Sequence, residues 1–101
     1  TESAELLELA SGGAGLVFSD FPNPELPEAD QSPGRILATV LTRDGRRGAE
    51  LITVSPPEAR PTGFFRATSD GDDVVIAYVD TAPGRLGTWI VRLRFVAASS
   101  P

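Results

Sequence analysis

The sequence predicts an all-β protein in which two antiparallel sheets of about seven strands pack as a sandwich. Apolar and polar residues alternate with a period of two along most of the chain, which is typical of strands. Clusters of glycine, proline and aspartate separate these alternating segments at regular intervals, as in sandwich folds. The chain has 101 residues and no cysteine, so one small core must stabilise it without disulfides.

The alternation is clear enough to predict strands at residues 16–19, 35–42, 50–55, 63–68, 73–80 and 88–97. Asp44-Gly45 favours a hairpin between the second and third of these segments, because glycine accepts the positive φ of a tight turn. The fifth segment is apolar on both faces, which predicts a central strand covered on both sides. In the last segment one set of side chains is expected to face the core: Trp89, Val91, Leu93, Phe95 and Ala97.

The N-terminal residues 4–10 combine high helix propensity with leucines that also fit a strand. Gly12-Gly13 would cap such a helix at its C-terminus. Because the pattern of the rest of the chain predicts strands, we expect a strand here as well, followed by a flexible connection over residues 11–15. The sequence thus divides into an N-terminal strand with a glycine-rich linker, residues 1–15, and a sandwich domain, residues 16–101.

Two proline-rich stretches, residues 21–34 and 55–61, interrupt the alternating pattern. Proline cannot donate to a strand ladder, so both stretches are predicted to leave the sheets or run along an edge. Prolines at such positions also discourage edge-to-edge aggregation of sheets.

The side-chain chemistry argues against catalysis. The chain has no histidine, cysteine, lysine or methionine, whereas most enzymes that work near neutral pH use an imidazole, a thiolate or an amine. We therefore expect a protein that is not an enzyme and needs no cofactor. The net charge of −5 argues against nucleic acid and anionic membranes as partners. No apolar run approaches the ~20 residues that span a bilayer.

The charges are unevenly distributed along the chain. Residues 1–34 hold seven acidic residues and no base, whereas residues 35–101 hold nine arginines and seven acidic residues, giving −7 and +2. An acidic leading segment and a basic body attract each other, within one molecule or between neighbours. The other interpretation is a leading segment that is simply solvated.

The candidate metal ligands are four aspartates: Asp70, Asp72, Asp73 and Asp80. Calcium takes about six to eight oxygen ligands, and three of these carboxylates lie within a single turn. Their spacing does not follow the EF-hand rule of alternating acids followed by a glycine and a final glutamate. The sequence favours a polar turn at this position, with calcium binding as the alternative.

Three arginines cluster at the tip of the predicted hairpin: Arg43, Arg46 and Arg47. Guanidinium groups bind carboxylates and sulfates in a bidentate manner, so the tip is a candidate interface for an acidic partner or a sulfated glycan. The competing interpretation is a solvated tip that keeps the turn soluble.

Short motifs occur in a fixed order between about residues 16 and 80. An acidic turn follows an early strand, a glycine-containing hairpin joins two strands, and the patterns T-G-x-F and G-D-x-V-x-x-x-Y-x-D follow. They occupy residues 19–26, 44–45, 62–65 and 71–80. This series resembles the Ig-like repeats of bacterial and archaeal surface proteins. The resemblance implies an Ig-like sandwich, an extracellular structural or adhesive role and no catalytic residues, although the family usually occurs in long tandem arrays.

These observations predict a non-catalytic extracellular structural protein that is a building unit of a cell-surface filament, pilus or adhesin. Copies are expected to form a homo-oligomer or polymer through their termini, with the first strand exchanged between subunits in a head-to-tail, donor-strand-like contact. The expected interface residues are Glu5, Leu6, Leu7 and Leu9, together with the three arginines of the hairpin tip.

The sequence is also compatible with two other functions. One is a carbohydrate- or calcium-binding accessory module of a larger secreted protein. The other is a cytosolic interaction domain, because removal of an initiator methionine would leave Thr1 as the first residue. Cleavage of a secretory signal, or excision of a domain from a longer protein, would equally leave a chain without methionine.

Overall fold

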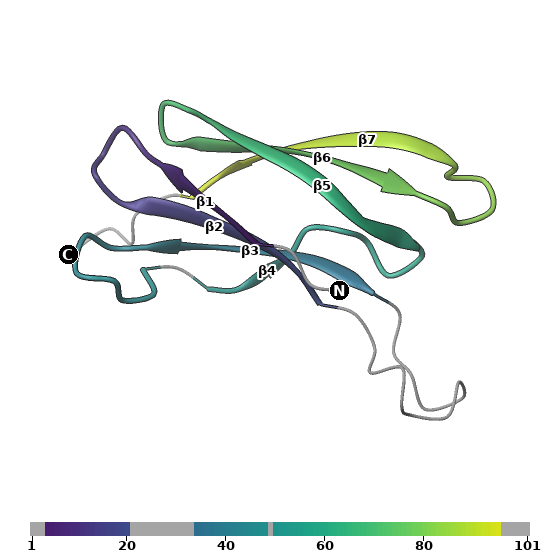
Figure 1. Ribbon diagram of the computed structural model, residues 1–101, viewed down its shortest axis with the longest axis horizontal. Helices are drawn as coiled ribbons and strands as arrows, with labels where there is room; N and C mark the ends of the chain where they lie inside the picture. Colours follow the sequence, from purple (N-terminus) through teal and green to yellow (C-terminus); the bar gives the residue numbers. More distant parts are fainter. Residues whose placement is uncertain (1–3, 21–33, 49, 96–101) are drawn as a thin grey trace.

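The computed structural model describes residues 4–20, 34–48 and 50–95. These residues form seven β-strands and no helix. The strands are β1 Ala4–Glu8, β2 Ala14–Asp20, β3 Arg35–Leu41, β4 Ile52–Thr53, β5 Pro61–Asp70, β6 Asp73–Asp80 and β7 Gly87–Arg94. They pair antiparallel into a four-stranded sheet, β1–β2–β3–β4, and a three-stranded sheet, β5–β6–β7 (Figure 1). The predicted all-β sandwich of two antiparallel sheets is therefore confirmed.

Each sheet is a meander, in which strands that follow one another in the sequence are also neighbours in the sheet. Among the described strands, the chain passes from one sheet to the other between β4 and β5. Ig domains differ in this respect, because Greek-key connections interleave their two sheets. The sandwich architecture is present here with a simpler strand order than the Ig arrangement.

The N-terminal segment forms a strand, as expected, and it pairs with β2 of the same chain. Ala4 lies opposite Phe18 at one end of the ladder, and Glu8 lies opposite Ala14 at the other. Strand β1 is therefore an edge strand of the sheet of its own chain.

The prediction of a flexible linker over residues 11–15 is wrong, because this segment forms a bonded turn and the start of β2. The amide of Gly12 donates to the carbonyl of Leu9 over 3.0 Å. Gly12 has a φ of 98°, a conformation that favours glycine. The amide of Ala10 donates to the carbonyl of Gly71, in the turn between β5 and β6, over 3.0 Å. Contacts from the β5–β6 turn thus hold this turn, and β2 already begins at Ala14, within the predicted linker.

The predicted hairpin between β3 and β4 is present, and Gly45 has the expected positive φ of 83°. Strand β4 comprises two residues instead of the expected six. Beyond β4 a side chain replaces the backbone as the hydrogen-bond acceptor for β3. The amide of Ile36 donates to the hydroxyl of Ser55 over 3.1 Å. Two prolines follow this serine, and neither can donate to a ladder.

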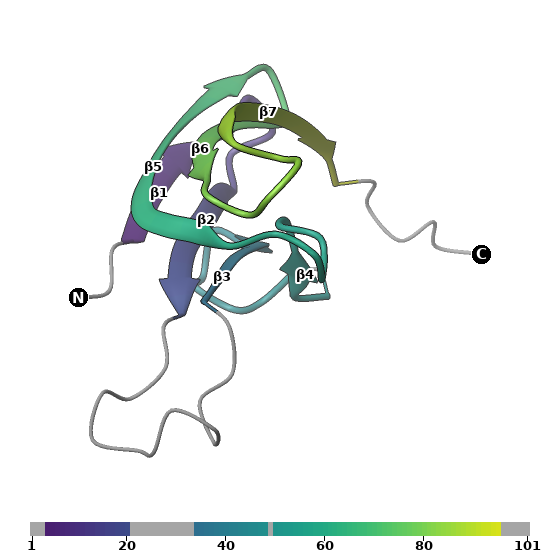
Figure 2. The same ribbon diagram turned by 90° about the vertical axis from the view of Figure 1, so that its right-hand side faces the viewer.

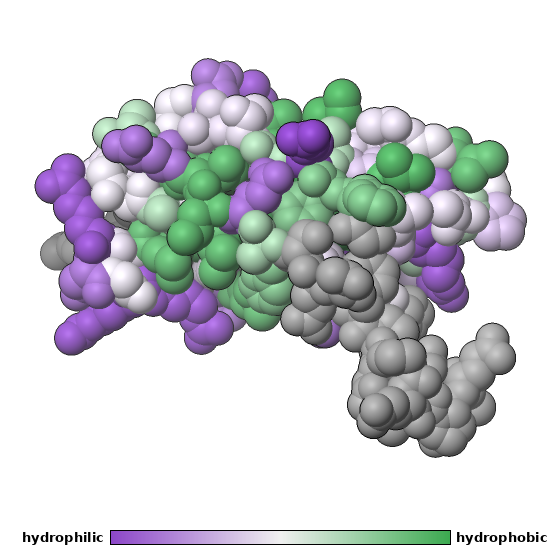
Figure 3. Space-filling model, in the orientation of Figure 1, coloured by the Kyte–Doolittle hydropathy of each residue, from purple (hydrophilic) through white to green (hydrophobic). Residues whose placement is uncertain are grey.

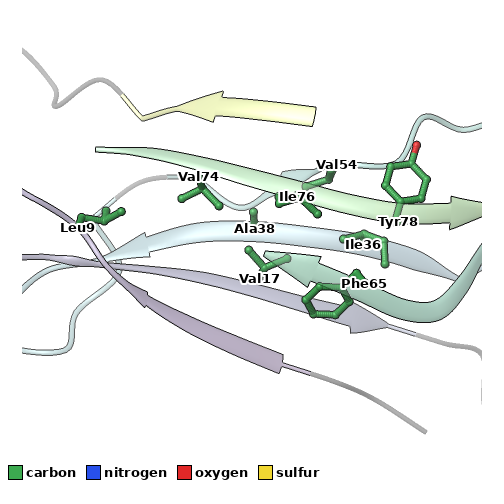
Figure 4. Packing of buried hydrophobic residues seen from close by; sticks show 9 residues of the cluster. All are labelled: Leu9, Val17, Ile36, Ala38, Val54, Phe65, Val74, Ile76 and Tyr78. Carbon is green, nitrogen blue, oxygen red and sulfur yellow. The ribbon is translucent and has the colours of Figure 1, made fainter. Parts of the chain in front are cut away.

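The core lies between the two sheets and is built from alternate residues of β2, β3 and β6 (Figure 4). Val17, Ile36, Val74 and Ile76 are fully buried. Tyr78 packs at one end of the same cluster, where its hydroxyl meets polar groups of the β6–β7 loop. The alternation thus places Ile36 of β3 and Val74 and Ile76 of β6 on the inward faces. In β2 the inward residue is Val17, whereas the larger Leu16 and Phe18 lie on the opposite face and are half-buried.

The outer face of β6 differs from the prediction. Val75 and Ala77 are half-buried, and Val79 is exposed, so this strand is central in its sheet but is not covered on both sides by described residues.

The inner face of β7 is less buried than the alternation suggests. Val91, Leu93 and Phe95 pack partly against the core, whereas Trp89 lies 39% exposed. Ala97 falls outside the described residues. Trp89 is exposed because the opposite sheet is narrow on this side. Its edge strand β4 comprises two residues and covers little of β7.

Candidate functional site

The loops β4–β5 and β6–β7 meet at the carboxylate of Asp80, which is fully buried at the end of β6. Its Oδ1 accepts hydrogen bonds from the backbone amides of Arg60 and Ala82, both at 2.9 Å. Its Oδ2 accepts a hydrogen bond of 2.7 Å from Nε of Arg85. Burial acts to raise the pKa of Asp80, but these hydrogen bonds outweigh it and hold the pKa below its ordinary value of 3.8.

The guanidinium of Arg85 is held on several sides. It stacks 3.9 Å from the centroid of the Trp89 ring, and its Nη2 lies 3.4 Å from the hydroxyl of Tyr78. Its Nη1 lies 3.7 Å from the carboxylate of Glu58. The indole Nε1 of Trp89 in turn donates to the carbonyl of Arg85 over 2.7 Å. We refer to Asp80, Arg85 and Trp89 as the Asp80 cluster, which no pattern in the sequence predicted.

A second ionic group lies at the opposite end of β6. The carboxylate of Asp73 accepts hydrogen bonds from Nη1 of Arg92 at 2.6 Å and from Nε of Arg94 at 2.8 Å. Arg92 also binds Asp70 over 2.9 Å. The hydrogen bonds from Arg94 and Arg92 lower the pKa of Asp73 to about 2. This group joins the two hairpins of the three-stranded sheet on its outer face.

The four aspartates predicted as calcium ligands do not converge on one point. Asp70 and Asp73 face arginines, Asp72 accepts a hydrogen bond of 2.8 Å from the amide of Ser11, and Asp80 lies at the far end of β6. Within the described residues, no group of three or more histidine, cysteine, aspartate or glutamate side chains is placed to hold a metal ion. The observed role of these carboxylates is to accept bonds from protein donors.

The predicted interface residues of the N-terminal segment, three in β1 and Leu9 directly after it, separate into two kinds. Leu9 is buried in the core, and Leu7 packs against it. Leu6 points outward and is 65% exposed. The carboxylate of Glu5 accepts a hydrogen bond of 2.9 Å from the backbone amide of Ala67 in β5. Two of the three leucine anchors are therefore used within the chain itself.

The three arginines of the hairpin tip are exposed. Arg46 lies 3.4 Å from the carboxylate of Asp44. Arg43 lies across the β1–β2 turn, where a Cβ added to Gly12 would overlap its guanidinium. A pocket of about 400 Å³ opens beside it, and its lining includes Arg43, Asp72, Leu9 and Phe95. The structure thus brings Arg43 to the acidic β5–β6 turn.

Large apolar side chains also reach the surface of the three-stranded sheet. Phe64 is 82% exposed and Ile90 is 71% exposed, both on the outer face, and Leu86 in the adjoining loop is likewise exposed. At the upper right of Figure 3, where Figure 1 places β6, β7 and the loop between them, apolar residues stand among neutral and polar ones. A larger continuous apolar surface lies left of centre in the same view, over β1 and β2. Exposed apolar residues gathered in this way mark candidate contact surfaces.

No protein-family model, curated protein or solved structure matches this chain. Within the residues that the structure describes, no helix is long and apolar enough to cross a membrane.

Proposed function

We propose that this chain is a non-catalytic extracellular structural domain, the building unit of a cell-surface filament, pilus or adhesin. The observation that carries the proposal is that the buried carboxylates of Asp73 and Asp80 are both bonded to arginines that join strands and loops. A general acid or base needs a pKa near the working pH, whereas both of these carboxyl groups have a lowered pKa. Their arrangement supports a mechanical role.

Hydrogen bonds between the sheets tie the sandwich at one end, which also suits a structural unit. Besides the bond from Ala10 to Gly71, the amide of Ser11 donates to Oδ1 of Asp72 over 2.8 Å. At the other end, Asp80 bonds the loop that links the two sheets. Local opening of a hairpin would break these bonds, so they raise the free energy of such opening.

Assembly in this proposal uses intact sandwiches. Donation of β1 to a neighbour would require five residue pairs with β2 to open. It would also remove Leu9 from the core and break the bond between Glu5 and Ala67. Contacts between folded surfaces avoid these costs.

The test is the location of the protein on intact cells of its source. We expect an antibody against the chain to label unpermeabilised cells, external protease to remove the label, and deletion of the coding sequence to remove a surface structure seen by electron microscopy. A cytosolic marker protein that stays unlabelled and uncleaved is the control. Labelling that requires permeabilisation would reject the proposal.

A second candidate function, a carbohydrate-binding accessory module, is favoured by the pocket beside Arg43. The lining of the pocket includes Arg43, Asp72 and Phe95, and a pocket that combines a few polar groups with apolar side chains suits a small polar ligand. Thermal melting with a panel of sugars tests it, since a ligand that binds the folded chain raises Tm. The stabilisation should vanish in Arg43→Gln and persist in Arg66→Gln, and a panel without effect would remove this candidate.

A further inference from the structure

The two sides of the sandwich differ in how their sheet edges are covered. On one side β1 contacts β5, and Figure 2 shows these two strands side by side. The carboxylate of Glu5 takes up the backbone amide of Ala67, which β5 would otherwise present at its edge. Pro61 and a bulge between Pro61 and Phe65 interrupt the same edge further along. Charges, prolines and bulges of this kind prevent the pairing of edges with other chains.

Strand β7 forms the other edge of the three-stranded sheet, and of these devices it carries only charged side chains, Arg92 and Arg94. It runs for eight residues, Gly87–Arg94, without a proline or a bulge in its ladder with β6. Its neighbour across the sandwich, β4, comprises two residues and is followed by Pro56 and Pro57. Within the part of the chain that the structure describes, β7 is therefore the longest regular edge.

On the inner face of the three-stranded sheet, burial is greatest on the central strand β6 and lower on β7. Phe65, Tyr78 and Trp89 form one cross-strand row on the inner face, and they are 9%, 2% and 39% exposed. In the next rows, Val91 is half-buried beside fully buried Ile76, and Leu93 is half-buried beside Val74. The apolar side chains of β7 therefore retain surface that a further strand would cover.

The arginines of β7 do not make this edge repulsive. Arg92 and Arg94 both bind Asp73 of the same chain, and Arg92 also binds Asp70. Their charges are thus balanced within each copy. An isologous antiparallel pairing centred on Ile90 would place Arg92 of each copy opposite Thr88 of the other, so no arginine faces another arginine. It would also place Trp89 opposite Val91, an aromatic and β-branched pair that stabilises sheets.

From these observations we propose that the free edge of β7 binds β7 of a second copy of this chain, forming a closed two-fold dimer with a continuous six-stranded sheet. Main-chain hydrogen bonds would provide the affinity, and the side-chain rows would fix the register. An isologous contact of this kind closes on itself, unlike a head-to-tail contact. The inference deepens the proposed function, on which it rests, by naming the surface through which two building units meet.

The experiment is sedimentation velocity of the 101-residue chain over a range of concentrations. We expect a reversible monomer–dimer equilibrium. Ile90→Glu places two carboxylates opposite each other at the centre of the pairing, because like charges across strands destabilise a sheet. We expect it to raise the dimer dissociation constant roughly tenfold or more.

Phe64→Glu is the matched control, because Phe64 is equally exposed on the same outer face but lies on β5, away from the β7 edge. It should leave the dissociation constant unchanged. If Phe64→Glu dissociates the dimer and Ile90→Glu does not, the contact lies on the flat face and the proposal is overturned. Circular dichroism confirms that each variant is folded.

A second pair of variants keeps the test decisive if Ile90→Glu does not fold. Thr88→Arg sets an added positive charge against Arg92 of the second copy and should weaken the dimer, whereas Thr88→Asp should strengthen it. A wild-type chain that stays monomeric at all concentrations, or that forms open polymers, would overturn the proposal. Neither result bears on whether the protein lies on the cell surface. Conversely, a dimer that is found inside cells would reject the proposed function but not the proposed contact between the β7 edges.

Discussion

Strand β6 begins and ends at a buried aspartate, and the two aspartates are held in different ways. Asp80 is bonded by two backbone amides and by an arginine whose side chain is 17% exposed. Asp73 is bonded by Arg92 and Arg94, whose side chains are 52% and 76% exposed. Solvent screens exposed ion pairs, whereas a buried amide that loses its acceptor retains its full desolvation cost. The end of β6 at Asp80 should therefore contribute more to stability than the end at Asp73.

The largest effect is expected from Asp80→Ala, which leaves the amides of Arg60 and Ala82 without an acceptor and Arg85 without its ion partner. We expect Tm to fall by roughly 10 °C or more. Asp80→Asn keeps one oxygen as an acceptor for the two amides, so it should lower Tm by less than Asp80→Ala does. Thermal denaturation followed by circular dichroism measures both, with Glu8→Gln on exposed β1 as the control. An alanine variant that melts with the wild type would remove the distinction between the two ends.

The next effect is expected from Arg85→Lys, which keeps the positive charge but loses the planar group that bonds Asp80 and stacks on Trp89. Lysine does not reproduce such a geometry, so we expect Tm to fall by about 5 °C. Tryptophan fluorescence should shift in the same variant, because the chain has a single tryptophan. Arg94→Lys at the opposite end is the matched control and should change neither signal.

Acid should reveal the contribution of the two carboxylates. The folded chain lowers the pKa of Asp73 from 3.8 to about 2, so the unfolded chain binds the proton first as the pH falls. The stabilisation from this group is complete above about pH 5 and is lost between there and about pH 2. Asp80 acts in the same direction. Urea denaturation from pH 7 to pH 2 should show this loss, with a shallower decline in Asp73→Asn; an equal slope would contradict the assignment.

The smallest effect is expected from Arg94→Ala. Its side chain is 76% exposed, and Arg92 still binds Asp73 in its absence, so Tm should fall by at most about 4 °C. The difference from the wild type should shrink further in high salt, which screens exposed charges. A fall in Tm as large as that expected for Asp80→Ala would show that the two ends of β6 contribute equally to stability.

The strands and their inward faces could be predicted from the sequence, because alternation is a local signal. Val74, Ile76 and Tyr78 face the core as the pattern indicates, and Asp44-Gly45 forms the predicted turn. The exposure of Trp89 could not be predicted in this way. It depends on the short length of β4 in the opposite sheet, and that length reflects a hydroxyl and two prolines that end the ladder.

The Asp80 cluster was missed for a related reason. The signal in the sequence is an aspartate at a strand end, followed by an arginine five positions later and a tryptophan four positions beyond the arginine. Whether the three side chains meet depends on the conformation of the loop between them. The turn at residues 11–13 was likewise predicted as flexible because its glycines suggest mobility. Its partners, Gly71 and Asp72, lie about 60 residues away in the turn between β5 and β6, and no local pattern reports such contacts.

The order of the strands has a consequence for the rate of folding. Every described pairing within a sheet joins strands that are adjacent in the sequence, and even the longest of these connections, from Asp20 to Arg35, is short compared with the whole chain. Contacts that are local in the sequence form fast. The contact between Ser11 and Asp72 instead spans 61 residues, and closing such a loop costs more chain entropy. We therefore expect the two sheets to form early and their docking to limit the rate.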